Sequence, residues 1–411
     1  MILEIQSNTK QNCIKNRFNE EIILILYFTL KPLYLFSSGL PQISDMFLIA
    51  AALGLLLKER GRIRIPYAYM QWVTIFLVTL VFQALVQSVW WVKTKDNRML
   101  LYAAYYLFNF IASIVCIYIG NAVGTERLKY ALCKGCFFSI IVAAIGIVTQ
   151  NRYHGIRSVG FFNNPNQLGY YALLVLTVIA FFPKVLPKWQ NIIILVVSVW
   201  ANLLSLSKAS IVGLAGLAIC YVIWGSNNKT IRKIVTEVLL LTVLFGAIYW
   251  LLYSNSRIIT GNAILSFLRR RLLRISLEND STLGNGRGYN RVWELGYHFL
   301  WGKGEGAYDR FNTLTGLEVH STFFNTLVSY GLFGFVAYFF LMVKPLQHQG
   351  NTVHNLACFS GLFLYFFTHN GIRNTLLWIL LSAVLQAGYL TEQNCEQTLP
   401  YINTDTGRLS A

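Results

Sequence analysis

Basic and histidine side chains gather in a few polar segments of a chain that is otherwise strongly apolar. Of its 411 residues, 55% are hydrophobic and only 12% are charged. Arg287 and Arg291 stand four residues apart, so they share one face if this segment is helical. Two guanidinium groups on one face form a fork that suits phosphate oxygens. A solvated basic loop is the alternative explanation of the pair.

Two further cations lie near predicted turns. Arg157 stands close to an aromatic pair, in a segment that continues to Asn166. The Asn-Pro-Asn sequence that ends there predicts a turn and the start of a helix, which accounts for the asparagines but not for the arginine. Lys208 follows a Leu-Ser turn. It is either a ligand for an anion or a side chain that reaches the membrane interface.

His320 stands where a long polar segment meets an apolar run, with Asn325 further along the same run. A histidine at the mouth of a membrane helix is a candidate general base. A polar helix start is the alternative. His369 and Arg373 flank the last turn on the same predicted side and could join the same site.

No metal or other cofactor is expected. Cys133 and Cys136 form a CxxC pair without the further ligands that a structural zinc site needs. Glu278 and Asp280 resemble an acidic metal pair, but a turn explains them as well. A metal-dependent transfer is therefore possible but not favoured.

The elements that must position these residues are membrane helices. A helix needs about 20 apolar residues to cross the hydrocarbon core, and runs of about this length recur along nearly the whole chain. We place them at 22–40, 43–57, 66–92, 99–120, 130–150, 166–183, 190–206, 209–225, 235–253, 321–343, 355–369 and 374–390. We predict an all-α, polytopic transmembrane helix bundle of about twelve spans, with one large extracytoplasmic loop that carries short helices.

The predicted segments are a cytoplasmic N-terminal tail at 1–20, spans one to nine within 21–253, the large outer loop at 254–320, spans ten to twelve within 321–390 and a cytoplasmic C-terminal tail at 391–411. Lys and Arg are more than twice as frequent in the short connectors of one side. The positive-inside rule makes that side cytoplasmic. Both termini are then cytoplasmic, and the candidate site faces outward. The net charge of +17 fits this topological role better than nucleic-acid binding.

Lys31 interrupts the first apolar run. It lies about nine residues into the run, so roughly 14 Å deep. An unpaired cation there costs at least roughly 2.5 kcal/mol, so we expect Lys31 to be paired inside the bundle. Pro32 is expected to kink the helix and to offer backbone carbonyls as partners. Lys31→Met is expected to be tolerated.

Five short motifs, in chain order, resemble the O-antigen ligase/polymerase superfamily of bacterial membrane proteins. They are R-x-x-G-x-F-x-N-P-N at 157–166, Ser-x-Ser-Lys at 205–208, Asn-Gly-Arg followed by Trp at 285–293, Gly-x-Gly at 302–304 and H-S-x-F-x-N…G-x-x-G at 320–334. The resemblance covers roughly residues 100–390.

The resemblance implies transfer of a glycan from an undecaprenyl-pyrophosphate carrier to an acceptor hydroxyl outside the membrane. Carried over by position, it implies that pyrophosphate is bound by basic residues, namely Arg157, Lys208, Arg287 and Arg291. It implies that His320 accepts the proton of the acceptor hydroxyl or orients that hydroxyl. Cations are needed there because negative charge develops on the leaving pyrophosphate. Further candidates are Asn166, Asn325, His369 and Arg373.

Three functions remain open. The favoured one is a polymerase of lipid-linked repeat units for capsule, exopolysaccharide or O-antigen. The second is a ligase that moves finished glycan onto a different acceptor, such as lipid A core. The third is a transporter or flippase, which should show inverted repeats and charges deep in its spans. The expected partners are lipid-linked glycan, acceptor glycan, membrane lipid and other polysaccharide-assembly proteins, and the expected location is the bacterial plasma (inner) membrane.

Overall fold

The structure is a computed structural model. It describes residues 21–36, 42–58, 67–94, 98–150, 153–154, 157–225, 288–305, 319–347 and 352–398. The tail at 1–20, the predicted span at 235–253, most of the predicted loop and the end of the chain from 399 lie outside the described residues. Arg287 and the Glu278–Asp280 pair are among the residues outside.

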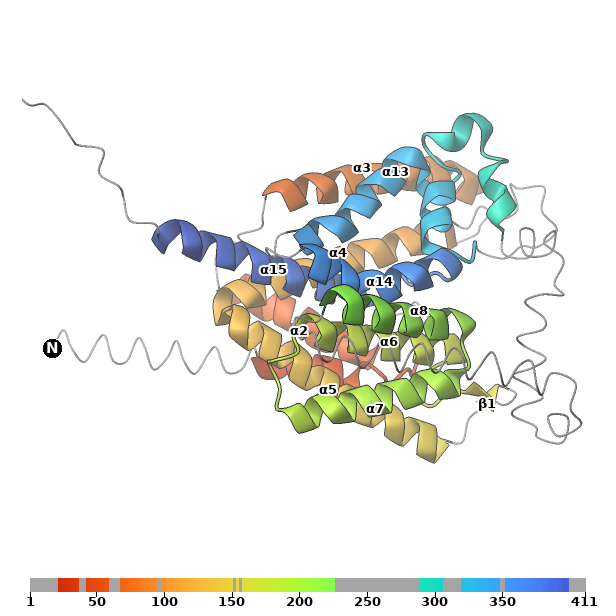
Figure 1. Cartoon of the computed structure of the whole chain (residues 1–411). Coiled ribbons are helices and arrows are strands. Elements are labelled where there is room, and N and C mark those ends of the chain that lie inside the picture. Colours follow the sequence, from red (N-terminus) through yellow and green to blue (C-terminus); the bar gives the residue numbers. More distant parts are fainter. Residues whose placement is uncertain are drawn as a thin grey trace, which may run out of the picture.

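The described residues form a bundle of helices that pack along one another (Figure 1). After the helix Glu21–Leu30 come α2 (Ile43–Lys58), α3 (Tyr67–Thr94), α4 (Arg98–Val123), α5 (Thr125–Gln150), α6 (Pro165–Phe181), α7 (Lys188–Ser205), α8 (Lys208–Cys220), α13 (Thr322–Gln347), α14 (Thr352–Thr368) and α15 (Thr375–Thr398). A π-helical turn, η1 (Tyr221–Gly225), continues α8. Two residues of β1 (Tyr153–His154) pair with β2 (Arg157–Ser158) in antiparallel register.

Every predicted span except 235–253 overlaps one of these helices. Four described helical stretches are long and apolar enough to cross a membrane, namely Tyr69–Val89, Ala103–Asn121, Thr125–Gln150 and Thr322–Gln347. The other apolar helices among the described residues are shorter. The structure is therefore that of an all-α membrane protein, with the small β1–β2 pair as an addition. The number of spans stays a prediction.

The first helix is shorter than its predicted span, 22–40. It ends at Leu30, and the amide of Lys31 donates to the carbonyl of Phe28 at 3.1 Å in a tight turn. Pro32 has no amide hydrogen to donate, and its ring disfavours a helical conformation of the residue before it. The proline therefore ends this helix, where we expected a kink within it.

Two helices form the centre of the bundle. In α15, every residue from Thr375 to Gly388 is buried, and the helix packs against α4, α5, α6 and α13. In α6, every residue from Leu168 to Val178 is buried. A helix that is apolar on all sides fits either a protein core or a membrane, and here the neighbouring helices cover both segments.

Close helix packing depends on glycine at the contact of α8 with α14. A Cβ at Gly213 would lie 2.7 Å from the carbonyl oxygen of Gly361. Small residues let two membrane helices approach to backbone contact. The glycines thus bring α14, which ends at the candidate site, tightly against α8.

One end of the bundle carries most of the predicted site residues, and we call it the polar end. It consists of residues 31–36, 157–164, 205–208, 320–322 and 369–374. Hydrogen bonds join these segments: the side chain of Asn163 donates to the carbonyl of Phe36 at 2.9 Å. The far end of α15 lies on the opposite side of the bundle from β1 (Figure 1).

Candidate functional site

Arg157 is held at the junction of three elements. It lies in β2, its Nε donates to the carbonyl of Ser205 at 2.9 Å, and one Nη donates to Oδ1 of Asn166 at 2.6 Å. The first acceptor ends α7 and the second lies in the first turn of α6. Because two acceptors fix the plane of the guanidinium, Arg157 is oriented before any ligand binds.

Lys208 begins α8 directly after a tight turn. Leu206 adopts the left-handed conformation with φ +46, and the amide of Ser207 donates to Oγ of Ser205 at 3.2 Å. This turn places Lys208 one residue beyond the cap and half-buried. The same Ser205 therefore supports both cations, Arg157 through its carbonyl and Lys208 through its hydroxyl.

Two tyrosine rings connect Arg157 to the other half of the polar end. Tyr170 lies one turn after Asn166 in α6 and stacks on Tyr365 of α14, with ring centroids 4.5 Å apart. Tyr365 interacts electrostatically with Arg157, and its ring centroid lies 5.3 Å from that of His369. The structure thus brings Arg157, Asn166 and His369 together from distant parts of the chain.

His320 and His369 lie beside each other where α13 begins and α14 ends. Their ring centroids are 6.4 Å apart, with His320 exposed and His369 half-buried. Thr322 holds the two segments together, because its amide and its hydroxyl both donate to the carbonyl of His369, at 3.2 and 3.1 Å. An exposed imidazole in this position can exchange a proton with a substrate hydroxyl.

Arg291 lies in different surroundings from those expected. It belongs to η2 (Tyr289–Val292) and is completely buried. Gly288, with φ +72, lies against it, since a Cβ there would be 3.4 Å from the guanidinium carbon. The hydroxyl of Tyr289 donates to the carbonyl of His320 at 3.2 Å. Arg291 therefore lies in the interior within η2 and does not face solvent.

The segment that follows η3 (Gly296–Phe299) is inserted against a kink of α13. At Gly331 the helix backbone becomes non-helical, with φ +68 and ψ −170. The carbonyls of Val328 and Ser329 instead accept hydrogen bonds from the amides of Lys303 and Gly304, at 2.8 and 2.9 Å. The insertion therefore satisfies backbone groups that the kink releases.

Glycine and glutamine residues make this insertion possible. Gly302 and Gly304 both have positive φ, and a Cβ at Gly302 would overlap the carbonyl of Ser329. The side-chain amides of Gln83 and Gln87 in α3 donate to carbonyls of the inserted segment. The Gly-x-Gly motif is thus a packing requirement, and it places the next residue, Glu305, inside the protein.

Glu305 is a residue of the site that sequence reasoning missed. It is 2% exposed. Its Oε1 accepts hydrogen bonds from the hydroxyl of Tyr106 and from Nδ2 of Asn325, each at 3.2 Å, and its Oε2 lies 3.4 Å from Nη2 of Arg373. An acidic residue directly after a Gly-x-Gly turn was the available signal. Glu305 joins two residues, Asn325 and Arg373, that the sequence proposed separately.

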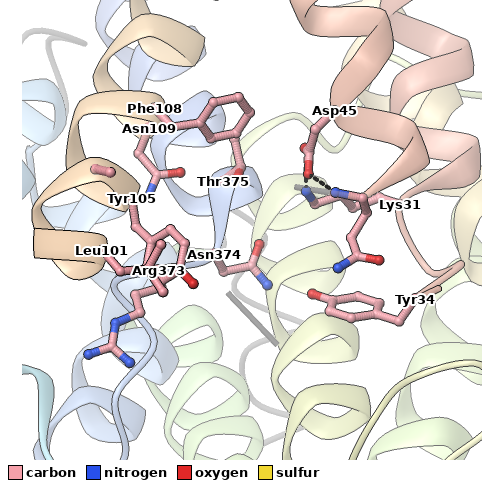
Figure 2. Close-up of a pocket in the computed structure, with 12 residues that line it drawn as sticks. Lys31, Tyr34, Asp45, Leu101, Tyr105, Phe108, Asn109, Arg373, Asn374 and Thr375 are labelled. Atoms are coloured by element: carbon pink, nitrogen blue, oxygen red, sulfur yellow. Dashed lines mark hydrogen bonds and ion pairs between the residues drawn. The ribbon is translucent and has the colours of Figure 1, made fainter. Parts of the chain in front are cut away.

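Lys31 is paired inside the bundle, as predicted, but its partner was not foreseen. Its Nζ lies 2.7 Å from Oδ1 of Asp45, and the two side chains are 4% and 3% exposed. The other oxygen of Asp45 accepts a hydrogen bond from the amide of Gln42 at 2.8 Å, at the start of α2. A carboxylate, and not a backbone carbonyl, therefore neutralises this cation (Figure 2).

The O-antigen ligase family model matches residues 193–339. This match supports the resemblance of the chain to the O-antigen ligase-like superfamily. The match covers about a third of the chain and includes Lys208, His320 and Asn325, whereas Arg157 precedes it. No curated protein matches the chain.

The match to the O-antigen ligase family supports a function of the O-antigen ligase or polymerase type. Members of this superfamily are glycosyltransferase-like membrane enzymes, and their partners are a lipid-linked glycan and an acceptor. The apolar helices and the family agree on an integral membrane protein. The described polar end brings together two cations, Arg157 and Lys208, and two histidines, His320 and His369.

Proposed function

We propose that this protein is a polymerase of lipid-linked oligosaccharide repeat units, for capsule, exopolysaccharide or O-antigen synthesis. Its donor would be a glycan on undecaprenyl pyrophosphate, and its acceptor a sugar hydroxyl on the outer face of the membrane. One observation supports this most strongly. Two cations, Arg157 and Lys208, and two histidines, His320 and His369, lie at the same end of the bundle in a chain that matches the O-antigen ligase family.

The cations would bind the pyrophosphate of the donor. Arg157 is oriented by Ser205 and Asn166. Lys208 is the first residue of α8, at the N-terminus, where the helix dipole is positive. Helix N-termini attract phosphate through their unpaired amides and the helix dipole. The first turns of α6 and α8 both begin at the polar end, so the backbone adds to the charge of the side chains.

The transfer exchanges one carbon–oxygen bond for another. The bond between the anomeric carbon and the pyrophosphate oxygen breaks, and its electron pair leaves with the pyrophosphate. The acceptor hydroxyl oxygen bonds to the anomeric carbon, and its proton passes to His320. The cations stabilise the charge that develops on the leaving group, while His320 acts as general base.

Of the two arginines near Trp293, we assign the pyrophosphate to Arg287. Arg291 is completely buried and lies under Gly288 in η2. A guanidinium in that position contributes by holding η2 against His320. Its replacement is expected to disturb the site through η2.

A ligase is the second candidate, and the O-antigen ligase description of the matching family favours it. The donor chemistry is the same for both reactions. They differ in the acceptor, which is another repeat unit for a polymerase and a different lipid-linked core for a ligase. Offering both acceptors to the purified protein separates the two functions.

The test uses the full chain in lipid nanodiscs with purified undecaprenyl-pyrophosphate-linked repeat units. Polymer length and donor binding are measured for the wild type and for His320→Ala and Arg157→Lys. His354→Ala and Arg127→Lys are matched controls, because they make the same changes elsewhere: His354 lies near the start of α14 and Arg127 is exposed near the start of α5.

We expect His320→Ala to bind donor almost normally and to slow transfer by roughly 10²–10⁴. Arg157→Lys should weaken donor binding, because an ammonium cannot reproduce the bidentate geometry of a guanidinium. The two controls should retain activity. Full activity of His320→Ala would remove this histidine from the mechanism, and a wild-type protein that transfers no glycan to either acceptor would contradict the proposed function.

A further inference from the structure

A polar cavity opens beside the site. Its volume is about 230 Å³, well above the ~30 Å³ that one water molecule occupies in the liquid. One wall is the first half of α4, the opposite wall is formed by the Lys31–Asp45 segment, and residues 373–375 close the space between them (Figure 2). Arg373 contributes to this cavity and also pairs with Glu305, so the cavity adjoins the cluster around Glu305.

The charges of this cavity are compensated. Lys31 is paired with Asp45 at 2.7 Å, and Arg373 is paired with Glu305 at 3.4 Å. A pyrophosphate site needs a surplus of cationic charge, which these two pairs do not supply. The cavity therefore suits a neutral ligand better than an anionic one.

Asn109 provides an independent indication of a ligand. It lies in α4, roughly 16 Å along the axis from the start of that helix, and is 1% exposed. Its Oδ1 is buried and accepts no hydrogen bond within the part of the chain that the structure describes. A buried acceptor without a donor is costly, and polar groups at membrane depth usually serve function. The side chain of Asn109 is part of the lining of the cavity.

The rest of the lining combines amides with aromatic rings. Asn374 presents a carboxamide, which carries both donors and an acceptor, and Thr375 adds a hydroxyl. Tyr34 and Phe108 supply ring surface on opposite walls (Figure 2). Hydroxyl groups of a sugar ring need paired donors and acceptors, and its C–H faces need apolar surface. The lining matches both requirements.

We propose that this cavity binds a neutral sugar ring of the glycan substrate, with Asn109 receiving a hydrogen bond from one sugar hydroxyl. The inference rests on the proposed function, because it names a subsite of that reaction. The ring could belong to the acceptor glycan or to the donor glycan, and both present the same hydroxyl chemistry. Asn109 is a binding residue in this role and takes no part in proton transfer.

Asn109→Leu tests the subsite. Leucine has a similar size and removes the unsatisfied buried acceptor, so the variant should fold at least as well as the wild type. Asn121→Leu is the matched control, since it makes the same change further along α4, where Asn121 accepts a hydrogen bond from Gln386. The full chain in nanodiscs elongates a labelled free repeat-unit oligosaccharide from lipid-linked donor, and the KM of each substrate is measured separately.

The expected result for Asn109→Leu is a KM about tenfold higher for one substrate, which is the loss of roughly one well-placed hydrogen bond, with kcat nearly unchanged. A rise confined to the oligosaccharide assigns the cavity to the acceptor, and a rise confined to the lipid-linked donor assigns it to the donor. Unchanged KM values for both substrates in an active Asn109→Leu protein would overturn the subsite and leave the proposed function standing. An inactive wild type would contradict the proposed function itself.

Discussion

At the scale of single residues, the polar end is organised by two buried carboxylates. Asp45 and Glu305 are each 2% exposed, and each lies within 4 Å of a cation. Removing one member of such a pair leaves an uncompensated charge in the interior, whereas removing both can be almost neutral. The sequence led us to expect that Lys31→Met is tolerated. Because the replacement would leave the buried carboxylate of Asp45 without its cation, we now expect it to be destabilising.

We predict that Lys31→Met lowers the stability of the folded protein by about 3–5 kcal/mol. The double variant Lys31→Met/Asp45→Asn should recover most of this loss, because asparagine keeps an acceptor for the amide of Gln42 without a charge. Thermal unfolding in detergent, followed by tryptophan fluorescence, measures the difference. Equal midpoints for Lys31→Met and the wild type would show that the ion pair contributes no stability.

At the scale of elements, the kink of α13 and the inserted segment 300–305 depend on each other. The kink releases the carbonyls of Val328 and Ser329, and the inserted segment supplies the amides that satisfy them. Gly331 is required at the kink because its φ is +68 and a Cβ there would overlap the carbonyl of Leu300. Since Glu305 ends the inserted segment, this packing also positions the carboxylate that pairs with Arg373.

We predict that Gly331→Ala destabilises the protein by at least about 1–2 kcal/mol, the cost of a left-handed conformation for a residue with a Cβ. The variant should also reduce transfer, because the overlap is with backbone that cannot move aside without displacing Glu305. Gly54→Ala is the matched control. A Cβ at Gly54, in α2, would have nothing within 4 Å of it, and alanine there should be neutral or favourable by up to about 1 kcal/mol. The unfolding midpoint and the transfer rate are measured for both variants. Equal values for Gly331→Ala and Gly54→Ala would show that the kink tolerates a side chain.

At the scale of the whole molecule, the connections place most of the described candidate residues at one end of the bundle. His320, at the start of α13, and Gln347, at the end of the same helix, lie at opposite ends. The bias of Lys and Arg in the short connectors predicts that the end with His320 faces outward. The orientation of the bundle in the membrane is therefore a prediction that labelling can test.

We predict that Tyr297→Cys is labelled by a membrane-impermeant maleimide on intact cells, in a background without the native cysteines. Tyr297 lies in η3 and is 83% exposed. The protein therefore does not shield this position, and only the membrane can keep the maleimide from a cysteine there. Gln347→Cys, also exposed, should react only after permeabilisation. Asn285→Cys extends the test to the predicted outer loop. The reverse pattern would invert the topology and place the proposed site on the cytoplasmic side.

Much of the helical framework was predictable from the sequence, because the length of an apolar run is a local property. A run of about 20 apolar residues has no other stable arrangement in a bilayer, and the helices at 67–94, 98–123 and 125–150 lie where such runs occur. The motifs also indicated the family and the candidate residues Arg157 and His320. Their positions at one end follow from the alternating directions of successive helices.

Tertiary structure alone decided which side chains meet and which are buried. Asp45 lies 14 residues after Lys31, and Glu305 lies 68 residues before Arg373, so no local spacing pairs them. The spacing predicted that Arg291 shares a face with Arg287 if the segment is helical, but no spacing predicted that Arg291 lies buried within the short η2. The physical reason is that the pairing of buried polar groups depends on how whole helices pack, because each such group must find a partner within the fold that surrounds it.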